Sequence, residues 1–347
     1  MSKRLFLGVS LLLTALGINA QTTREQLLQN SRQWVVTKAD KQVDRHIVTS
    51  QQSLMLHIAD GKLELKNEVF DFSDIKSLRT AAVTHFSLDE DSTAFKADYG
   101  VNFGLLALRR SLVVGKWNTL TLPVELTGRQ VLETFGESAA VAQFDKVTEE
   151  GVVELSAIDL DTDDVVMSVG KQYLIRPSKE PDVLAGSTTA QTYGKAKVDG
   201  PVWLLAGVSM KQGLSSPSNT ALRSSEDNVR LSVAGSYYSR NVSGTAARPA
   251  YTIDETSLFT PYTESFTTKG FTAWAVLSRN KNDVPIRFYI NGVNEDITTD
   301  IVALPASLRN SSEDAVFDLQ GRKLNSLPTT PRRSGIYIVN GRKQVVR

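Results

Sequence analysis

Apolar and polar positions alternate with a period of two along much of this 347-residue chain, and this pattern constrains the fold more than any other feature. Successive side chains of a β-strand point to opposite faces, so such alternation is typical of strands with one buried face. Leu54, Leu56 and Ile58 occupy alternate positions, and Asp60-Gly61 behind them suits a two-residue hairpin turn. The pattern predicts a β-hairpin over 54–65.

Two further segments show the same alternation. Their apolar positions are Val229, Leu231 and Val233 in the first, and Ile286, Phe288 and Ile290 before Asn291-Gly292 in the second. Half-exposed strands of this kind favour antiparallel sheets over buried parallel ones. The chain is therefore predicted to be mainly β, with antiparallel β-sandwich-like units, one or two short helices and a small C-terminal β module.

Helix signals occur twice. Thr23 and Gln26 have the spacing of a capping box, which predicts a short helix over 22–34. Thr127 and Gln130 form a second box before an apolar face of Val131, Leu132 and Phe135, and Gly136 stands where that helix would end.

Composition shifts divide the chain. Residues 176–194 and 213–228 are rich in Pro, Gly, Ser and Thr, so they are interpreted as long loops. The predicted organisation is a signal peptide (1–20), a helix and hairpin unit (21–95), a main β-sandwich-like domain (96–306), a linker (307–315) and a C-terminal module (316–347).

Charge and cysteine content exclude several functions. The chain has 39 basic and 38 acidic residues, so no overall field attracts nucleic acid, and nucleic acid is not expected as a partner. Cysteine is absent, which excludes disulfides and thiolate chemistry.

The N-terminus has the order of a signal peptide. Lys3 and Arg4 precede an apolar run, and small residues lead to expected cleavage between Ala20 and Gln21. An uncleaved anchor is the alternative, but the run is shorter than the ~20 residues of a membrane span. No membrane span is expected in the mature chain.

The last residues, "VFDLQGRKL", "SGIYIV" and "NGRKQVVR", resemble the C-terminal sorting domain of proteins exported by the Por, or type IX, secretion system. The matching positions are Asp318, Gly321, Gly335, Tyr337, Arg342 and Lys343. The resemblance implies passage through the periplasm to the outer cell surface or the medium, with the secretion machinery as partner. The alternative is an ordinary hairpin that closes the main sandwich.

Residues 105–178 carry a second resemblance, to a segment of uncharacterised surface proteins of the same bacteria. It rests on "GKWNTLTLP", "FG" and "YLIRP", with Val124 where phenylalanine is usual. Trp117, Asn118 and Thr119 within it are interpreted as a buried indole and turn-capping side chains rather than a ligand site.

No catalytic motif stands out. His46, His57 and His85 adjoin no nucleophile motif, and no cofactor or metal site is expected. The segment "DLDTDD" (159–164) resembles the start of a calcium loop, but Asp164 and Gly170 occupy the positions that need glycine and glutamate, so a solvated hairpin tip is predicted. Asp89, Glu90 and Asp91 are interpreted as another loop.

Short surface motifs leave the function open. Asp91-Ser92-Thr93 resembles the O-glycosylation site of exported proteins in these bacteria. Tyr237, Tyr238 and Trp274 are candidates to stack on sugars, but aromatic side chains more often fill cores, and that interpretation is favoured. The predicted function is non-enzymatic, in adhesion, glycan binding or surface structure, with a glycan or a host or cell-surface ligand as external partner. The alternative is a secreted, glycosidase-like hydrolase with scattered acidic residues.

Overall fold

The computed structural model describes residues 31–48, 54–57, 60–65, 68–184, 200–253, 258–291, 295–297, 316–318, 323–324, 335–339 and 342–346. Strands make up 54% of the structure and helices 5%, which confirms a mainly β protein with several antiparallel sheets. Contacts divide the chain into two compact units, residues 1–299 and 300–347. The expected signal peptide with Ala20 and Gln21, the linker and Gly321 lie outside the described residues.

The first strands of the larger unit form two small sheets around one core. β1 (Arg32–Lys38) pairs antiparallel with β2 (Val43–Val48) and with β6 (Ile75–Ala81). β3 (Leu54–His57), β4 (Lys62–Leu65) and β5 (Glu68–Asp71) form the second sheet, and a 3-10 turn, η1 (Phe72–Asp74), leads to β6. The core side chains are Val36, Val48, Leu63, Leu65 and Phe70.

This region confirms one prediction and corrects two. The hairpin over 54–65 is present, but His57 pairs with Lys62, so four residues rather than a two-residue turn connect its strands. The predicted helix over 22–34 is wrong at its end, where residues 32–34 begin β1; residues 22–30 lie outside the described part. Val35 and Val36 follow directly, and pairing with strands on both sides stabilises the β conformation there.

A four-stranded sheet bounds the next core, which is called the first core. Its order is β15 (Asp182–Leu184), β16 (Gly200–Met210), β8 (Val101–Arg109) and β7 (His85–Asp89). The helix α2 (Gly128–Phe135) packs against β16, near the short pair of β10 (Leu126–Thr127) and β13 (Val165–Met167). Buried members include Phe86, Leu88, Leu106, Leu108, Val131, Phe135, Trp203 and Leu205.

The capping box predicted for α2 is confirmed. The Thr127 hydroxyl accepts a hydrogen bond from the Gln130 backbone N–H, and the Gln130 side chain accepts one from the Thr127 N–H in return. Val131 and Phe135 are buried, as the apolar face predicted, and Gly136 ends the helix with a positive φ of 107°. In the described part of the chain, no helix has the length and apolar character needed to cross a membrane.

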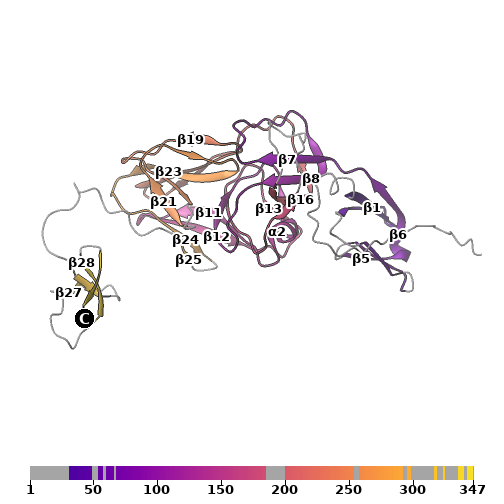
Figure 1. Cartoon of the computed structure of the whole chain (residues 1–347), viewed down its shortest axis with the longest axis horizontal. Coiled ribbons are helices and arrows are strands. Elements are labelled where there is room, and N and C mark those ends of the chain that lie inside the picture. Colours follow the sequence, from indigo (N-terminus) through magenta and orange to yellow (C-terminus); the bar gives the residue numbers. More distant parts are fainter. Residues whose placement is uncertain are drawn as a thin grey trace, which may run out of the picture. The chain divides into compact units, whose positions relative to one another are not determined.

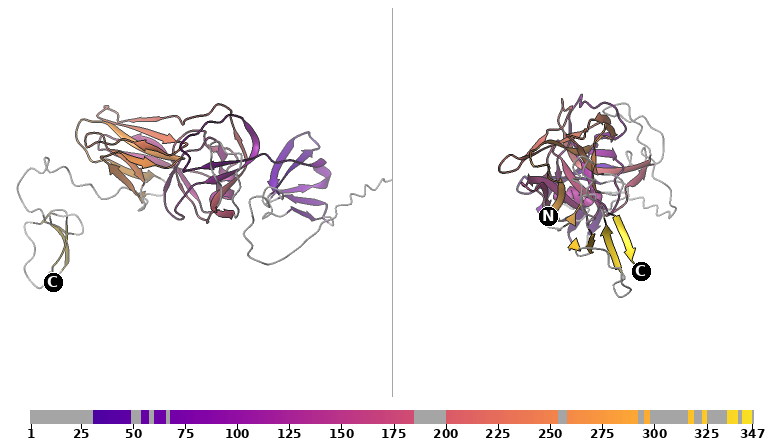
Figure 2. Two further views of the ribbon diagram at one scale, coloured as in Figure 1. Left: turned by 45° about the horizontal axis from the view of Figure 1, so that its top comes forward. Right: turned by 90° about the vertical axis from the view of Figure 1, so that its left-hand side faces the viewer.

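Two sheets enclose the second core. One has the order β25 (Glu295–Asp296), β24 (Arg287–Asn291), β12 (Val152–Ile158), β11 (Ala140–Val147), β14 (Tyr173–Arg176) and β9 (Asn118–Leu120). The other has the order β17 (Thr220–Arg223), β18 (Val229–Ser236), β23 (Thr272–Asn280), β20 (Ala250–Ile253) and β21 (Phe259–Tyr262). The sheets form two layers (Figure 2), with Trp117, Phe144, Leu155, Leu231, Val233, Leu277, Phe288 and Ile290 between them.

Two strand pairs among the described residues are parallel, which the alternation did not predict. β7 runs parallel to β8 (Figure 1), and β12 runs parallel to β24. Because β7 and β8 pair in one sheet, the boundary expected between residues 95 and 96 cuts through the first core, and the N-terminal sheets end with β6 instead. The regions 176–194 and 213–228 are not loops throughout, since they contain β15 and β17.

The smaller unit contains a four-stranded sheet in the order β27 (Lys323–Leu324), β26 (Val316–Asp318), β28 (Gly335–Val339) and β29 (Arg342–Val346). β28 and β29 form the predicted C-terminal hairpin: Val339 pairs with Arg342, which leaves Asn340-Gly341, outside the described residues, as the connection. Within the described residues, β29 pairs only with β28 and is therefore an edge strand.

Candidate functional site

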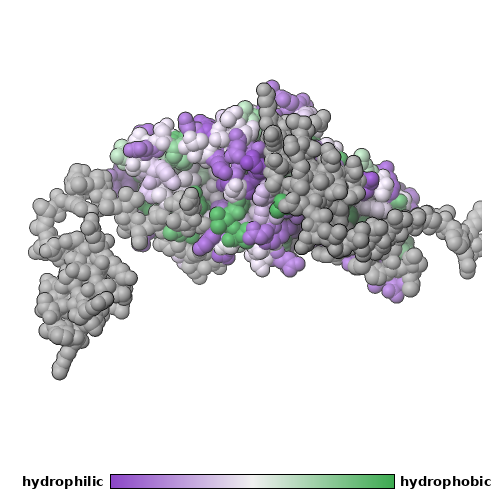
Figure 3. Space-filling model, viewed as in Figure 1, coloured by the Kyte–Doolittle hydropathy of each residue, from purple (hydrophilic) through white to green (hydrophobic). Residues whose placement is uncertain are grey.

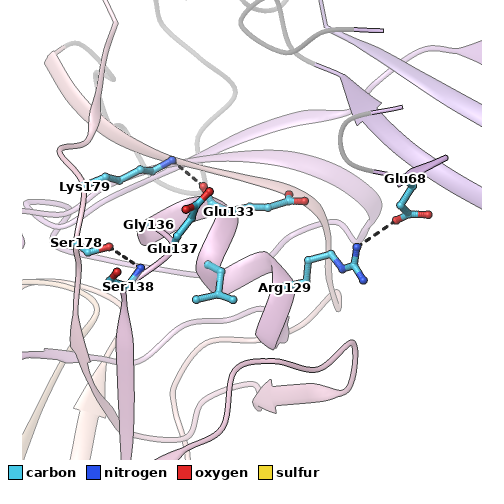
Figure 4. Close-up of a pocket in the computed structure, with 9 residues that line it drawn as sticks. Glu68, Arg129, Glu133, Gly136, Glu137, Ser138, Ser178 and Lys179 are labelled. Atoms are coloured by element: carbon cyan, nitrogen blue, oxygen red, sulfur yellow. Dashed lines mark hydrogen bonds and ion pairs between the residues drawn. The ribbon is translucent and has the colours of Figure 1, made fainter. Parts of the chain in front are cut away.

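A groove of about 630 Å³ runs along α2, from Arg129 in its first turn to Gly136 at its C-terminal end (Figure 4). Its lining carries both signs of charge and two hydroxyl groups, from Glu68, Arg129, Glu133, Glu137, Ser138, Ser178 and Lys179, together with Leu132 and Gly136. Among these described lining residues there is no histidine that could activate a serine. The groove therefore offers hydrogen bonds and charges to a polar ligand rather than an evident nucleophile.

The end of α2 builds one wall of this groove. Gly136 is required there, because its φ is positive and an added Cβ would lie 2.2 Å from the Ser178 hydroxyl oxygen. The Ser178 backbone N–H donates to the Phe135 carbonyl oxygen at 2.8 Å, and the Lys179 ammonium donates to the Glu133 carbonyl oxygen at 2.7 Å. The last helical carbonyls are thus satisfied by the segment that follows β14.

Arg129 forms the other end of the groove. Its guanidinium donates to both carboxylate oxygens of Asp163, at 2.7 and 3.0 Å, and lies 3.7 Å from Glu68. The bidentate hydrogen bond to Asp163 raises the pKa of Arg129 above its ordinary value. Arg129 therefore remains charged, and its guanidinium is already bound to the carboxylate of Asp163.

The acidic segment 159–164 supports α2. The Gly128 N–H donates to the Asp164 carbonyl, and the Arg129 N–H donates to the Thr162 carbonyl. The segment is not a hairpin tip as predicted, because β12 before it and β13 after it belong to different sheets. Within the described residues, no group of three or more histidine or carboxylate side chains is arranged to hold a metal ion.

Glu90 is the most deeply buried charged group described, and sequence reasoning placed it in a solvated loop. It is 1% exposed, directly after β7, and its carboxylate accepts hydrogen bonds from four donors. They are the Arg110 guanidinium (2.8 Å), the Lys269 ammonium (2.8 Å), the Ser111 hydroxyl (2.6 Å) and the Ser111 N–H (3.0 Å).

These donors decide the charge of Glu90. Burial by itself raises the pKa of a carboxyl group, but Arg110, Lys269 and Ser111 outweigh it and lower the pKa of Glu90 to about 2. Burial lowers the pKa of Arg110, and Glu90 opposes that effect. The pair is an ionised buried salt bridge, with Arg109 bound beside it to Asp89 and Asp91 at 2.7 Å each.

A turn from the other sheet closes over Glu90. The Gly270 N–H donates to the Glu90 carbonyl oxygen at 2.7 Å, and the Phe271 N–H donates to the Ser236 carbonyl oxygen at 2.6 Å. Phe271 has a positive φ of 59° and is buried in the first core although β23 begins immediately after it. The Glu90 cluster therefore joins the β7–β8 sheet to the sheet of the second core.

The other residues singled out in the sequence have structural surroundings. His46 is buried in β2 with its ring edge against Phe70, while His57 and His85 lie in β3 and β7. Tyr237 is fully buried and Trp274 is 6% exposed, so both fill the interior, which is the interpretation that the sequence favoured over stacking on a sugar.

The reading of Trp117 and Asn118 as structural residues is confirmed. Trp117 is 2% exposed in the second core. The Asn118 side chain accepts from the Val113 N–H at 2.9 Å and donates to the Lys116 carbonyl oxygen at 2.7 Å, which fixes the preceding turn.

In the smaller unit, the backbone register brings the described sorting-motif residues onto neighbouring strands. Asp318 of β26 pairs with Tyr337 of β28, and Gly335 begins β28. Arg342 and Lys343 open the edge strand β29. The matched positions are thus gathered in one small sheet rather than spread through the larger unit.

Comparison with family models, with characterised proteins and with solved structures gives no match to this chain.

Proposed function

We propose that this is a secreted or cell-surface protein without enzymatic activity, whose residues 316–347 are a C-terminal sorting module read by the export machinery. The observation that carries the proposal is the separate C-terminal unit, in which Asp318, Gly335, Tyr337 and the basic strand β29 share one sheet. An adhesive, glycan-binding or structural surface role fits the two β-sandwich-like cores of the larger unit.

The test is deletion of residues 316–347, followed by cell fractionation and circular dichroism. The described residues of the first and second cores end at Ile297, so the truncated protein should keep its β spectrum. We expect it to accumulate in the periplasm while the full chain reaches the surface. A truncated protein that still reaches the surface contradicts the sorting role, and one that unfolds identifies the tail as part of the main core.

A secreted hydrolase is the second candidate, because the groove beside α2 brings together Glu68, Glu133 and Glu137. A glycosidase needs two such carboxylates across the scissile bond. We expect no turnover by purified protein on a panel of chromogenic glycosides and esters. Turnover abolished by Glu133→Gln or Glu137→Gln, and retained by Glu180→Gln outside the groove, would establish the hydrolase instead.

A further inference from the structure

Three arginines stand side by side across three neighbouring strands of the larger unit. In the backbone register, Arg223 at the end of β17 pairs with Arg230 of β18, and Arg230 pairs with Arg279 of β23. Directly opposed residues on adjacent strands have Cβ atoms roughly 5 Å apart, and like charges at that distance destabilise a sheet. A row of three is therefore a cost to folding that a ligand can offset.

The arginine row, Arg223, Arg230 and Arg279, lies on the outer face of the five-stranded sheet. Leu222 and Leu231, which neighbour it along β17 and β18, are buried in the second core. Side chains alternate between the two faces of a strand, so Arg223 and Arg230 lie on the face opposite to that core. A register shift beside Arg230 interrupts the alternation of β23, and Arg279 lies beside Arg230 because both bind Asp227. Arg223 is exposed, and the side chains of Arg230 and Arg279 are 36% and 34% exposed.

One carboxylate lies within the row. Asp227 accepts hydrogen bonds from two nitrogens of Arg230 and, at 3.1 Å, from Arg279. Among the described residues, the Arg223 guanidinium forms no hydrogen bond or ion pair. The pKa of Arg230 is lowered by desolvation and then by the positive charges of Arg223 and Arg279. The single carboxylate of Asp227 therefore does not cancel the repulsion between the three arginines.

Two other carboxylates lie near the turn between β17 and β18, but both face other donors. Glu149 accepts hydrogen bonds from the Ser225 hydroxyl, the Glu226 N–H and the Asn228 amide, and the Glu226 carboxylate also accepts from Asn228. These bonds hold the turn, which positions Asp227. Among the described residues, the three positive charges of the arginine row are therefore opposed by one bound carboxylate, that of Asp227.

Short side chains border the arginine row. The adjacent cross-strand row consists of Ala221, Ser232 and Val276, which are small or β-branched side chains. A hairpin of β19 (Arg240–Val242) and β22 (Phe266–Thr268) packs over Trp274, and Val276 is partly buried against the same cluster. The described surface over β19 and β23 is mostly hydrophilic or of intermediate hydropathy (Figure 3).

We propose that the arginine row binds a linear acidic polysaccharide, whose carboxylate or sulfate groups lie across β17, β18 and β23. The planar guanidinium forms paired hydrogen bonds with an oxyanion. A row of guanidinium groups therefore suits a ligand whose anionic groups repeat along an extended chain. No aromatic side chain in either cross-strand row could stack on nucleic-acid bases. Three arginines supply only ~3 kcal/mol toward an anionic membrane, which disfavours a lipid surface.

The test is binding of purified full-length protein to a sulfated polysaccharide (heparin), a polyuronate (alginate) and neutral dextran, by calorimetry at low salt. We expect heparin or alginate to bind and dextran not to bind, with binding weakened at higher ionic strength. Alginate carries carboxylates alone and heparin carries sulfates as well, so binding to heparin but not to alginate identifies sulfate as the required group, and binding to alginate shows that carboxylates suffice. Binding to dextran with equal strength, or to neither acidic polymer, would overturn the proposal.

Point variants locate the site. Arg223→Gln should weaken binding by about three- to tenfold, whereas Arg45→Gln, on exposed β2 surface with the same change in net charge, should not. Asp227→Asn should strengthen binding, because it removes the carboxylate that neutralises the row and asparagine tolerates the positive φ of 60°. A gain of affinity does not arise from misfolding. Equal affinities for Arg223→Gln and Arg45→Gln would refute the site, whether or not the export proposal holds.

Discussion

Glu90→Gln should destabilise the larger unit strongly. The change preserves the size of the side chain but leaves Arg110, whose side chain is 9% exposed, without its carboxylate partner. Removing one partner of a buried ion pair typically costs about 3–5 kcal/mol. The pKa of Glu90 leads to a similar figure, because a decrease from 4.5 to about 2 corresponds to about 3 kcal/mol of free energy.

The pH dependence has a defined sign. A carboxyl group with a lowered pKa stabilises the fold above its unfolded pKa, and this contribution disappears as the pH falls through the folded value. The difference in unfolding free energy between the wild type and Glu90→Gln should therefore be constant at neutral pH and decrease between about pH 4.5 and 2. Urea unfolding followed by circular dichroism at several pH values measures it.

Two companion variants separate the explanations. Asp91→Asn alters a half-exposed partner of Arg109 and should cost less than about 1 kcal/mol. The apolar pair Glu90→Leu with Arg110→Met should recover most of the lost stability, because no buried charge remains unpaired. If Glu90→Gln costs under about 1 kcal/mol at pH 7, or if its effect does not depend on pH, the assignment of Glu90 as an ionised buried group is incorrect.

Three further predictions concern α2 and its neighbouring loop. Gly136→Ala should lower stability in urea by about 1–3 kcal/mol more than Gly115→Ala, since both glycines have positive φ but only the first Cβ meets other atoms within 4 Å. Gln130→Ala should cost about 1–2 kcal/mol, and Gln130→Glu part of that, because glutamate keeps the capping acceptor but cannot donate to the β16 carbonyls. Calorimetry should detect no saturable calcium binding by the 159–164 segment, so a one-site isotherm lost in Asp161→Ala would contradict the reading of that loop.

The elements that the sequence predicted best are those determined by neighbouring residues. The capping box of Thr127 and Gln130 satisfies backbone donors within one helical turn, and the alternation at Val229, Leu231 and Val233 follows from one buried face. Both signals are local. The parallel pairing of β12 with β24 joins segments far apart in the chain, and the alternation of a strand does not specify its partner.

The Glu90 cluster was missed for a related reason. An acidic residue between two others is usually solvated, and only its partners reveal a buried position. Arg110 is 20 residues away and Lys269 is 179 residues away, so no local pattern connects them. The arginine row could not be predicted from the sequence for the same reason. The register of β17, β18 and β23 brings its members together, and no local sequence pattern marks any of them.

The two groups of charges differ in a way that separates their roles. Around Glu90, the buried Arg110 faces a carboxylate, and Ser111 and Lys269 saturate its remaining oxygen lone pairs. Burial makes this balance necessary, because an unpaired ion in the interior costs several kcal/mol. The arginine row is exposed to solvent, so its charges do not each need a partner. The sheet there places the exposed Arg223 beside two other guanidinium groups. Substitution at Glu90 should therefore be visible in unfolding experiments, whereas substitution at Arg223 should change polyanion binding and leave stability within about 0.5 kcal/mol.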